Sequence, residues 1–315
     1  MIGQFRKTAI LTAAAAMALV ALGGAAKAAT APASDPHIVA RFNLAAGQTP
    51  EDFALAPDGA VDVSFAYADE VASVARSGDT RILGQLPKTG NCPVIAAPVS
   101  LGIARASDGT VYAVDCTGNA DTGVWRLRAG SAPVQIAQLP ADSFPHKMVL
   151  DDQDGDIYIA DSVLGVVWRV PAEGGTPAIW AQGPALQRTS VFGANGITLH
   201  DHAIWVSNTD QGTIVEIPIR ADGSAGPIRT VATGLAGQVD DFTVLGQDDT
   251  ILAALNPASQ VVIIKAGSQP QVLLTAADGL SNPTDVAVQG DTIYVTSAAY
   301  FTHSDPNLLV ARFAS

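Results

Sequence analysis

The chain has 315 residues, of which 48% are hydrophobic, and it carries 30 acidic against 17 basic side chains, a net charge of −13. This excess of acid disfavours binding to nucleic acid or anionic membranes, both of which require clustered cations. The sequence also contains no Walker loop, dinucleotide fingerprint, Gly-x-Ser-x-Gly elbow or CxxC motif, so the enzyme classes that depend on them are disfavoured.

The start of the chain is typical of a secretory signal peptide. Basic residues 6–7 precede an apolar run over residues 8–23, and the small-x-small pattern AKA follows at residues 26–28. We therefore expect residues 1–28 to be removed on export and residues 29–36 to form a disordered lead-in. The apolar run is short for a bilayer span, which predicts a periplasmic or secreted bacterial protein without a membrane anchor; an uncleaved anchor is the alternative.

One pattern then returns six times along the chain. Each copy has a hydrophobic strand, a short polar turn often written Asp-Gly, and a second strand that usually carries Tyr or Trp, a combination typical of β-hairpins. The copies begin at Pro50, Ser100, His146, Ala194, Val239 and Pro283. Two further strands follow in most copies, for example residues 166–170 and 178–181 in the third. A four-stranded repeat of about 45–50 residues is typical of a propeller blade.

The two ends of this repeat array complement each other. The sixth copy has a third strand at residues 308–311 and no fourth, whereas His37–Leu44 (HIVARFNL) has the pattern of a fourth strand without a blade. We therefore predict an all-β fold, a six-bladed β-propeller over residues 37–315 that is closed by this N-terminal strand. Closure pairs strand edges that an open array would expose. A β-sandwich or two smaller β-domains are the alternatives.

A propeller brings the same position of every repeat to one central axis. Alignment of the repeats on the turn and on the aromatic residue of the second strand places six residues there: Glu51, Leu101, Lys147, Asn195, Asp241 and Thr284. Glu51, Asn195 and Asp241 would supply two carboxylates and an amide oxygen, a ligand set suited to a hard divalent cation. We expect Ca²⁺ first, with Mg²⁺, Mn²⁺ or Zn²⁺ as alternatives. The competing interpretation is a set of solvated or internally hydrogen-bonded residues at the starts of strands.

The motifs PEDFAL with Glu51, GANGITL with Asn195 and VDDFTV with Asp241, together with the repeat pattern, resemble the SMP-30/gluconolactonase/LRE-like family. The resemblance extends over essentially the whole mature chain. It implies a six-bladed propeller that binds a divalent metal through a Glu, an Asn and an Asp at these positions and hydrolyses lactones or related esters. The sequence departs from the family where VDD replaces Pro-Asp-Gly and where PHKM at residues 145–148 replaces a polar Asn-Asp-Gly run. PHKM also resembles the Pro-His-Gly run of paraoxonase-like propellers.

The chemistry expected from this resemblance is hydrolysis of a small-molecule lactone or ester, with the cation polarising the carbonyl group. We assign Asp241 as metal ligand and general base, and His146 as the competing base. Lys147 either polarises the substrate carbonyl or pairs with Glu51 or Asp241 and lowers the affinity for the metal.

Residues in the rim loops are candidates for substrate binding and for covalent stabilisation. We expect Arg188, Tyr300 and His303 to line a substrate pocket, although aromatic residues in loops can equally cap neighbouring blades. Cys92 and Cys116 fall in loops on one face of the second blade, so we expect a disulfide in an exported chain rather than two separate buried thiols. We expect a monomer.

Two other functions remain open at this point. One is a non-enzymatic propeller that binds a ligand or partner on its rim, since the fold alone does not choose a function. The other is a metal-free enzyme related to strictosidine-synthase-like propellers. Glu51, Asn195 and Asp241 favour metal chemistry, whereas Leu101 and Lys147 favour a metal-free channel.

Overall fold

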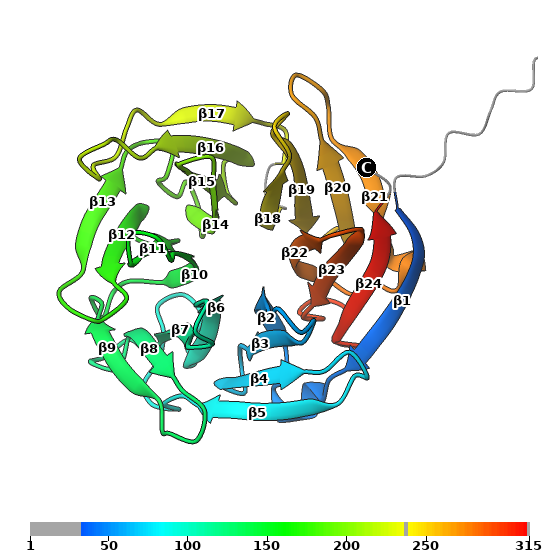
Figure 1. The fold of residues 1–315 in the computed structure, drawn as a ribbon, viewed down its shortest axis with the longest axis horizontal. Coiled ribbons are helices and arrows are strands. Elements are labelled where there is room, and N and C mark those ends of the chain that lie inside the picture. The colour runs from blue at the N-terminus through cyan, green and yellow to red at the C-terminus, as the bar shows by residue number, and fades with distance from the viewer. Residues whose placement is uncertain (1–32, 236–238, 314–315) are drawn as a thin grey trace, which may run out of the picture. The chain divides into compact units, whose positions relative to one another are not determined.

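The computed structural model describes residues 33–235 and 239–313, so the expected signal peptide lies outside the described residues. Within these ranges, six antiparallel sheets of four strands each stand around a central axis (Figure 1). This arrangement confirms the predicted six-bladed β-propeller. The helices of the described ranges are two short 3₁₀ turns, η1 (Leu44–Ala46) and η2 (Ala276–Asp278), and no helix found there has the length and apolarity needed to cross a membrane.

Each blade starts with its strand nearest the axis, and the first five blades use consecutive strands. The first contains β2 (Pro50–Leu55), β3 (Val61–Phe65), β4 (Glu70–Val74) and β5 (Thr80–Gln85). The second contains β6 (Val99–Arg105), β7 (Val111–Cys116), β8 (Gly123–Leu127) and β9 (Val134–Gln138). The third contains β10 (Pro145–Asp151), β11 (Asp156–Asp161), β12 (Val166–Pro171) and β13 (Ala178–Gln182).

The remaining blades follow the same order. The fourth contains β14 (Ala194–His200), β15 (Ala203–Asn208), β16 (Thr213–Pro218) and β17 (Arg229–Ala232). The fifth contains β18 (Val239–Leu245), β19 (Thr250–Leu255), β20 (Gln260–Ile264) and β21 (Gln271–Leu274). The sixth contains β22 (Pro283–Gln289), β23 (Thr292–Ser297), β24 (Asn307–Phe313) and β1 (Ala33–Arg41).

The N-terminal strand closes the ring as predicted, because β1 pairs antiparallel with β24 and forms the outer edge of the sixth blade. The strand begins at Ala33 rather than His37 and ends at Arg41 rather than Leu44. Residues 33–36, which we expected to be disordered, therefore belong to the blade. The register shifts between Ser34 and His37, so Pro36 lies in a β-bulge on an edge strand, a place where its missing N–H is tolerated.

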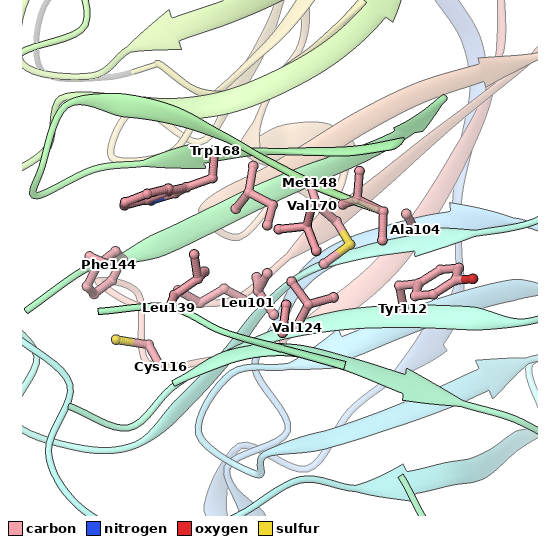
Figure 2. Packing of buried hydrophobic residues seen from close by; sticks show 14 of the residues in the cluster. Leu101, Ala104, Tyr112, Cys116, Val124, Leu139, Phe144, Met148, Trp168 and Val170 are labelled. Atoms are coloured by element: carbon pink, nitrogen blue, oxygen red, sulfur yellow. The ribbon is translucent and has the colours of Figure 1, made fainter. Parts of the chain in front are cut away.

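Apolar side chains of neighbouring blades pack against each other, as Figure 2 shows for the second and third blades. Leu101 and Val124 from the second blade lie in one buried cluster with Met148, Trp168 and Val170 from the third. Each blade therefore buries its faces against its two neighbours, which lets a chain of this length form one core around the axis.

The predicted disulfide joins Cys92 and Cys116, whose Cα atoms are 5.2 Å apart. Cys92 lies in the connection between β5 and β6, and Cys116 is the last residue of β7. Both cysteines are buried, so the bond anchors this connection to the second blade.

Two neighbouring blades each bury an aspartate near the end of the second strand, but only one of the two carboxylates accepts hydrogen bonds. In the third blade, Asp161 accepts hydrogen bonds from three backbone N–H groups and from Trp168 Nε1, the last at 2.9 Å. In the second blade, both carboxylate oxygens of the fully buried Asp115 lack a hydrogen-bond partner among the described residues. Burial first, and then the nearby Asp69 and Asp121, raise the pKa of Asp115 to about 9. The protein therefore favours the protonated form of Asp115 at neutral pH.

We expect Asp115→Asn to stabilise the protein at high pH. Because the pKa of Asp115 is raised from about 4 in the unfolded chain to about 9, its contribution to stability is full below about pH 4 and is lost as the pH rises through this window. The amide carries no charge, so the free energy of unfolding should rise by up to about 5 kcal/mol at pH 8, with little change near pH 4. Urea denaturation at both pH values measures this difference.

Asp161→Asn is the matched control for this substitution. The new amide NH₂ cannot accept from the donors that Asp161 serves, so we expect a loss of about 1–3 kcal/mol at both pH values. A destabilised Asp115→Asn variant at pH 8 would show that the Asp115 carboxylate is satisfied after all.

Candidate active site

Each innermost strand carries a break in its register at the same place, directly after its first paired residue or residues. Counting from this break gives two layers of side chains at the axis. The upper ring consists of Glu51, Leu101, His146, Asn195, Asp240 and Thr284. The lower ring consists of the next residue of each strand, Asp52, Gly102, Lys147, Gly196, Asp241 and Asp285.

The structure therefore corrects the sequence alignment by one residue in the third and fifth blades. His146 and Asp240, rather than Lys147 and Asp241, are equivalent to Glu51. The reason is a difference in hairpin length. The Asp of the Asp-Gly turn lies five residues after Phe53 in the first blade but six residues after Met148 in the third. Alignment on the turn consequently shifts the start of the strand by one position.

The upper ring forms the floor of a cavity of about 980 Å³. Its lining includes Glu51, Leu101, His146, Asn195 and Asp240 from this ring. Two of the three residues predicted to bind substrate, Tyr300 and His303, also line the cavity. The third, Arg188, is exposed and does not belong to the lining, and neither do Lys147 and Asp241.

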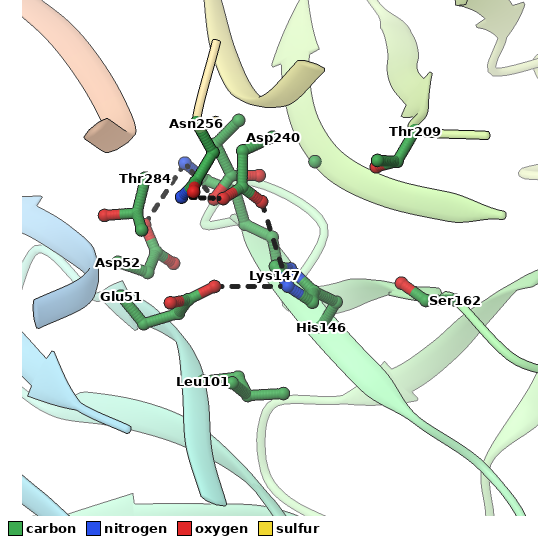
Figure 3. Close-up of polar contacts among 12 residues, drawn as sticks. Glu51, Asp52, Leu101, His146, Lys147, Ser162, Thr209, Asp240, Asn256 and Thr284 are labelled. Carbon is green, nitrogen blue, oxygen red and sulfur yellow. Dashed lines mark hydrogen bonds and ion pairs between the residues drawn. The ribbon is translucent and has the colours of Figure 1, made fainter. Parts of the chain in front are cut away.

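A chain of polar contacts crosses the floor from the sixth to the fifth blade, and Figure 3 shows its part from Glu51 through His146 to Asp240 and Asn256. The Tyr300 hydroxyl donates to Glu51 Oε2, and Glu51 Oε1 lies 3.2 Å from His146 Nε2. The same imidazole nitrogen is 3.9 Å from Asp240 Oδ1, and Asp240 Oδ2 accepts from Asn256 Nδ2 at 2.9 Å. One ligand atom each from Glu51, His146 and Asp240 lie within 4.8 Å of one another, which is close enough for them to share one ion.

Three titratable side chains at the floor, Asp240, His146 and Tyr300, have raised pKa values. Burial, followed by the charge of Glu51, raises the pKa of Asp240 to about 8. Burial alone would lower the pKa of His146, but the hydrogen bond and charge of Glu51 and the charge of Asp240 outweigh it and raise that pKa. Burial and the adjacent Glu51 carboxylate also raise the pKa of Tyr300 well above its usual value. The site therefore binds positive charge, either as a proton or as a cation.

Asn195 provides an independent indication of a ligand. Its side chain is buried and lines the cavity, and its Oδ1 atom has no hydrogen-bond partner among the described residues. Buried polar atoms are nearly always paired, so an unpartnered amide oxygen on a residue of the cavity lining indicates a missing binding partner such as a cation. The carboxylates of Glu51 and Asp240 and this amide oxygen form a donor set that fits a divalent cation, with the His146 imidazole beside it.

The lower ring holds a second set of buried charges beneath the cavity. Lys147 Nζ lies 2.5 Å from Asp285 Oδ1, 3.1 Å from Asp52 Oδ1 and 3.6 Å from Asp241 Oδ2. A Cβ atom at Gly196 would lie 2.5 Å from Asp241 Oδ1, so glycine is required at this position of the ring. The ring is thus packed around the Lys147 ammonium group. Lys147 pairs with Asp241, as one of the alternatives from the sequence proposed, and its other acidic partners are Asp52 and Asp285 rather than Glu51.

The lower ring brings one ammonium group together with three carboxyl groups, so the cation does not neutralise all of the acids. Burial would lower the pKa of Lys147, but Asp241, Asp285 and Asp52 together raise it well above its usual value. Burial raises the pKa of both Asp52 and Asp241 well above its usual value, and the Lys147 charge offsets only part of this rise. Lys147 therefore remains charged, and the three carboxylates depend on it.

We expect Lys147→Met to destabilise the protein by about 3–5 kcal/mol, because it leaves three buried carboxylates without their cation. Lys265→Met is the matched control: Lys265 is exposed in the connection between β20 and β21, and its replacement should have little effect. The free energy of unfolding from urea titration measures both variants. Equal stability of the two would mean that the lower ring does not rely on the ammonium group.

No role was expected from the sequence for Asp240, Asp52 or Asp285. A usable signal was present, because Glu51-Asp52 and Asp240-Asp241 are both adjacent acidic pairs, each followed directly by Phe. Counting back from the hydrophobic residue after the pair, rather than from the turn, aligns them as the structure does. Asn256, which follows β19, carried no such signal.

No protein-family model and no curated protein matches the chain. Solved structures with a similar fold are found, however. A gluconolactonase from Xanthomonas campestris is 16% identical, with a TM-score of 0.63 over 90% of this chain and 98% of its own. A PQQ-bound aldose sugar dehydrogenase from Streptomyces coelicolor is 16% identical, with a TM-score of 0.62 over 90% and 100%. Virginiamycin B lyase from Staphylococcus aureus is 16% identical, with a TM-score of 0.60 over 85% and 82%.

These similarities establish the fold. At such low identity they do not transfer an activity, and the three proteins carry names of three different reactions. The same scaffold thus supports unrelated chemistry, so a function for this chain has to come from its own site.

Proposed function

We propose that the protein is a divalent-metal-dependent hydrolase of lactones or related esters, and a member of the SMP-30/gluconolactonase/LRE-like family. The observation that carries the proposal is the group formed by Glu51, His146 and Asp240 with the unpartnered Asn195 oxygen on the floor of one large cavity. Similarity of fold to a gluconolactonase supports it.

Glu51, Asn195 and Asp240 are the residues that would hold the cation, with Asp240 in place of the Asp241 expected from the sequence. Asp241 belongs to the acidic group around Lys147, 3.6 Å from its ammonium nitrogen, and is a less suitable ligand because it lies outside the cavity lining. A bound divalent cation would supply Lewis-acid polarisation of the ester carbonyl. Ca²⁺ and Mn²⁺ suit this set of oxygen ligands, and they leave the His146 imidazole free to act as a base.

His146 is the residue that moves the proton in this proposal. In its neutral form, Nε2 accepts a proton from the attacking water, whose oxygen forms the new bond to the carbonyl carbon. The acyl C–O bond then breaks, and the imidazolium returns the proton to the departing alkoxide oxygen. Glu51 and Asp240 stabilise the imidazolium between these steps, at 3.2 Å and 3.9 Å from Nε2.

Two aromatic residues position this proton carrier. Phe144 stacks on the His146 ring, with ring centroids 5.9 Å apart and an interplanar angle of 26°, and so restricts its rotation. The Tyr300 hydroxyl holds the Glu51 carboxylate from the other side. Residues with fixed orientation lower the entropy cost of reaching the reactive geometry.

A metal-free acid–base enzyme is the second candidate. The specific observation in its favour is that Glu51 and Asp240 already pair with a positive charge, the His146 imidazolium that the raised pKa favours. Catalysis in that case would use the imidazole and the two carboxylates alone.

We also propose that the protein acts after export, in the periplasm or outside the cell. The signal-like N-terminus motivates this, and the Cys92–Cys116 disulfide is compatible with an oxidising compartment.

The adjacent acids Asp240 and Asp241 give a sharp test of the metal site. We expect Asp240→Asn to weaken cation binding to the chelator-treated protein at least about tenfold, a loss that even substitutions behind the ligands can cause. Asp241→Asn, one residue away but below the cavity, should change the affinity little. Isothermal titration with Ca²⁺, Mn²⁺ and Zn²⁺ measures both variants. Equal losses would locate the site elsewhere, and no binding at millimolar cation would refute it.

The reaction itself is tested with a panel of δ-lactones and aryl esters, with and without chelator. We expect hydrolysis that chelation abolishes, and a loss of about 10²–10⁴-fold in kcat for His146→Gln with cation binding retained. The outer strand β9 of the second blade offers a distant control, because Val134→Ser there should retain wild-type rates. Hydrolysis that survives chelation would establish the metal-free enzyme instead. Absence of hydrolysis for every compound would count against both.

A further inference from the structure

The cavity above the upper ring divides into a polar floor and a largely apolar wall. Charged and amide side chains gather at the floor, where Glu51, His146, Asn195, Asp240 and Asn256 lie. The wall is formed mainly by apolar and aromatic residues from the rim loops and strand starts, including Tyr67, Ile95, Phe144, Val191, Phe192 and Phe301. A ligand in this cavity therefore meets polar partners at one end and apolar surface along most of its length.

The aromatic part of the wall contains two pairs of packed rings, and each pair contacts a residue of the polar floor. Tyr67 packs edge-on against Tyr300, with ring centroids 5.9 Å apart. Phe144 packs against Phe192, with centroids 5.4 Å apart. Tyr300 and Phe144 each also contact a floor residue, Glu51 and His146 respectively. The aromatic surface therefore continues directly from the proposed reacting group to the mouth.

Apolar side chains at the mouth are left open to solvent. Phe301 is 65% exposed, Tyr67 45% and Val191 39%, and all three line the cavity. Large apolar residues at the rim of a pocket mark surface that a ligand covers. Folding does not require the Phe301 side chain there, since its backbone N–H donates to Asn282 Oδ1 at 2.9 Å and fixes the loop.

Charge restricts the ligand further. None of the described residues that line the cavity is Lys or Arg, whereas Glu51, Asp210 and Asp240 all belong to the lining. Backbone N–H groups outweigh burial and lower the pKa of Asp210, so a negative charge is fixed near the mouth. An anionic substituent would find no cation along this wall.

Size and polarity also argue against a sugar lactone. A cavity of about 980 Å³ lies at the upper end of the range for drug-sized ligands, well beyond the size of a single hydroxylated ring. Hydroxyl groups placed against the wall would lose water without gaining partners, which is unfavourable.

We infer that this site takes uncharged lactones or esters that carry an extended apolar chain, with the ester group on the polar floor and the chain along the aromatic wall towards Phe301. That these ligands are hydrolysed rests on the proposed function, whereas their chemical class rests on the cavity alone.

The first test compares kcat/KM for δ-valerolactone, δ-decalactone, δ-dodecalactone and glucono-δ-lactone. We expect a rise of about twofold to fourfold per added methylene group and the lowest value for the hydroxylated lactone. A chain of equal length that ends in a carboxylate should lower kcat/KM at least about tenfold relative to the methyl-ended chain. Rates that do not depend on chain length, or that are highest for glucono-δ-lactone, would overturn the inference.

A pair of exposed apolar residues tests the location of the chain. Phe301→Ser should reduce the preference for δ-dodecalactone over δ-valerolactone, because it removes apolar surface at the mouth. Val272→Ser is the control, since Val272 is 53% exposed on the outer strand β21 and lies outside the cavity lining. Identical chain-length preferences in both variants would show that the chain does not reach Phe301.

A binding measurement separates failure of this inference from failure of the proposed function. The corresponding 6-alkyl δ-lactams resist hydrolysis, so calorimetry reports their affinity whether or not the protein is a hydrolase. Affinity that increases with chain length in the absence of any lactone hydrolysis would retain the ligand class and reject the reaction. Affinity that does not depend on chain length would reject the ligand class, whatever the enzyme assays show.

Discussion

The arrangement of the axis depends on one buried ammonium group. Lys147 from the third blade reaches carboxylates from the first, fifth and sixth blades, Asp52, Asp241 and Asp285. The second and fourth blades contribute glycines to this ring, at Gly102 and Gly196. Asp52 also accepts a hydrogen bond from the backbone of Ile103 in the second blade, at 2.8 Å. Buried charges are costly unless they are paired, so this group ties separate blades to one centre and thereby fixes the layer above it.

The upper ring also pairs buried acids with a basic side chain, but these residues line a cavity. Its acids, Glu51 and Asp240, share one imidazole and face a cavity, where a proton, a cation or a substrate can reach them. Beneath them, the Lys147 ammonium group lies among the lower-ring carboxylates, and neither Lys147 nor these acids belong to the cavity lining. Two adjacent residues on one strand thus serve separate purposes: His146 contributes to the candidate site, and Lys147 to the stability of the ring. Groups with strongly raised pKa values are expected in both settings, so geometry has to distinguish them.

Much of the fold could be predicted because it is periodic. The six hairpin patterns, the unpaired strand before them and the two cysteines predicted the blades, the closure and the disulfide that the structure shows. Glu51 and Asn195 were placed in the correct ring for the same reason. The ring positions assigned in the third and fifth blades, Lys147 and Asp241, were wrong by one residue, because the alignment followed the turn and the hairpins of these blades are longer than that of the first. Arg188 shared a loop setting with Tyr300 and His303, and nothing in its sequence context indicated that it would lie outside the cavity lining.

The sequence by itself determined which residues form strands, how many blades there are and which end closes the ring, because these follow from local hydrogen bonding and from alternation along the chain. The tertiary structure alone decided which member of each polar pair faces the cavity. In Glu51-Asp52, His146-Lys147 and Asp240-Asp241, successive side chains leave a strand on different sides, and a bulge next to the axis sets which one faces up. The physical reason is that a shift of one residue in register exchanges the two layers while leaving every local propensity unchanged.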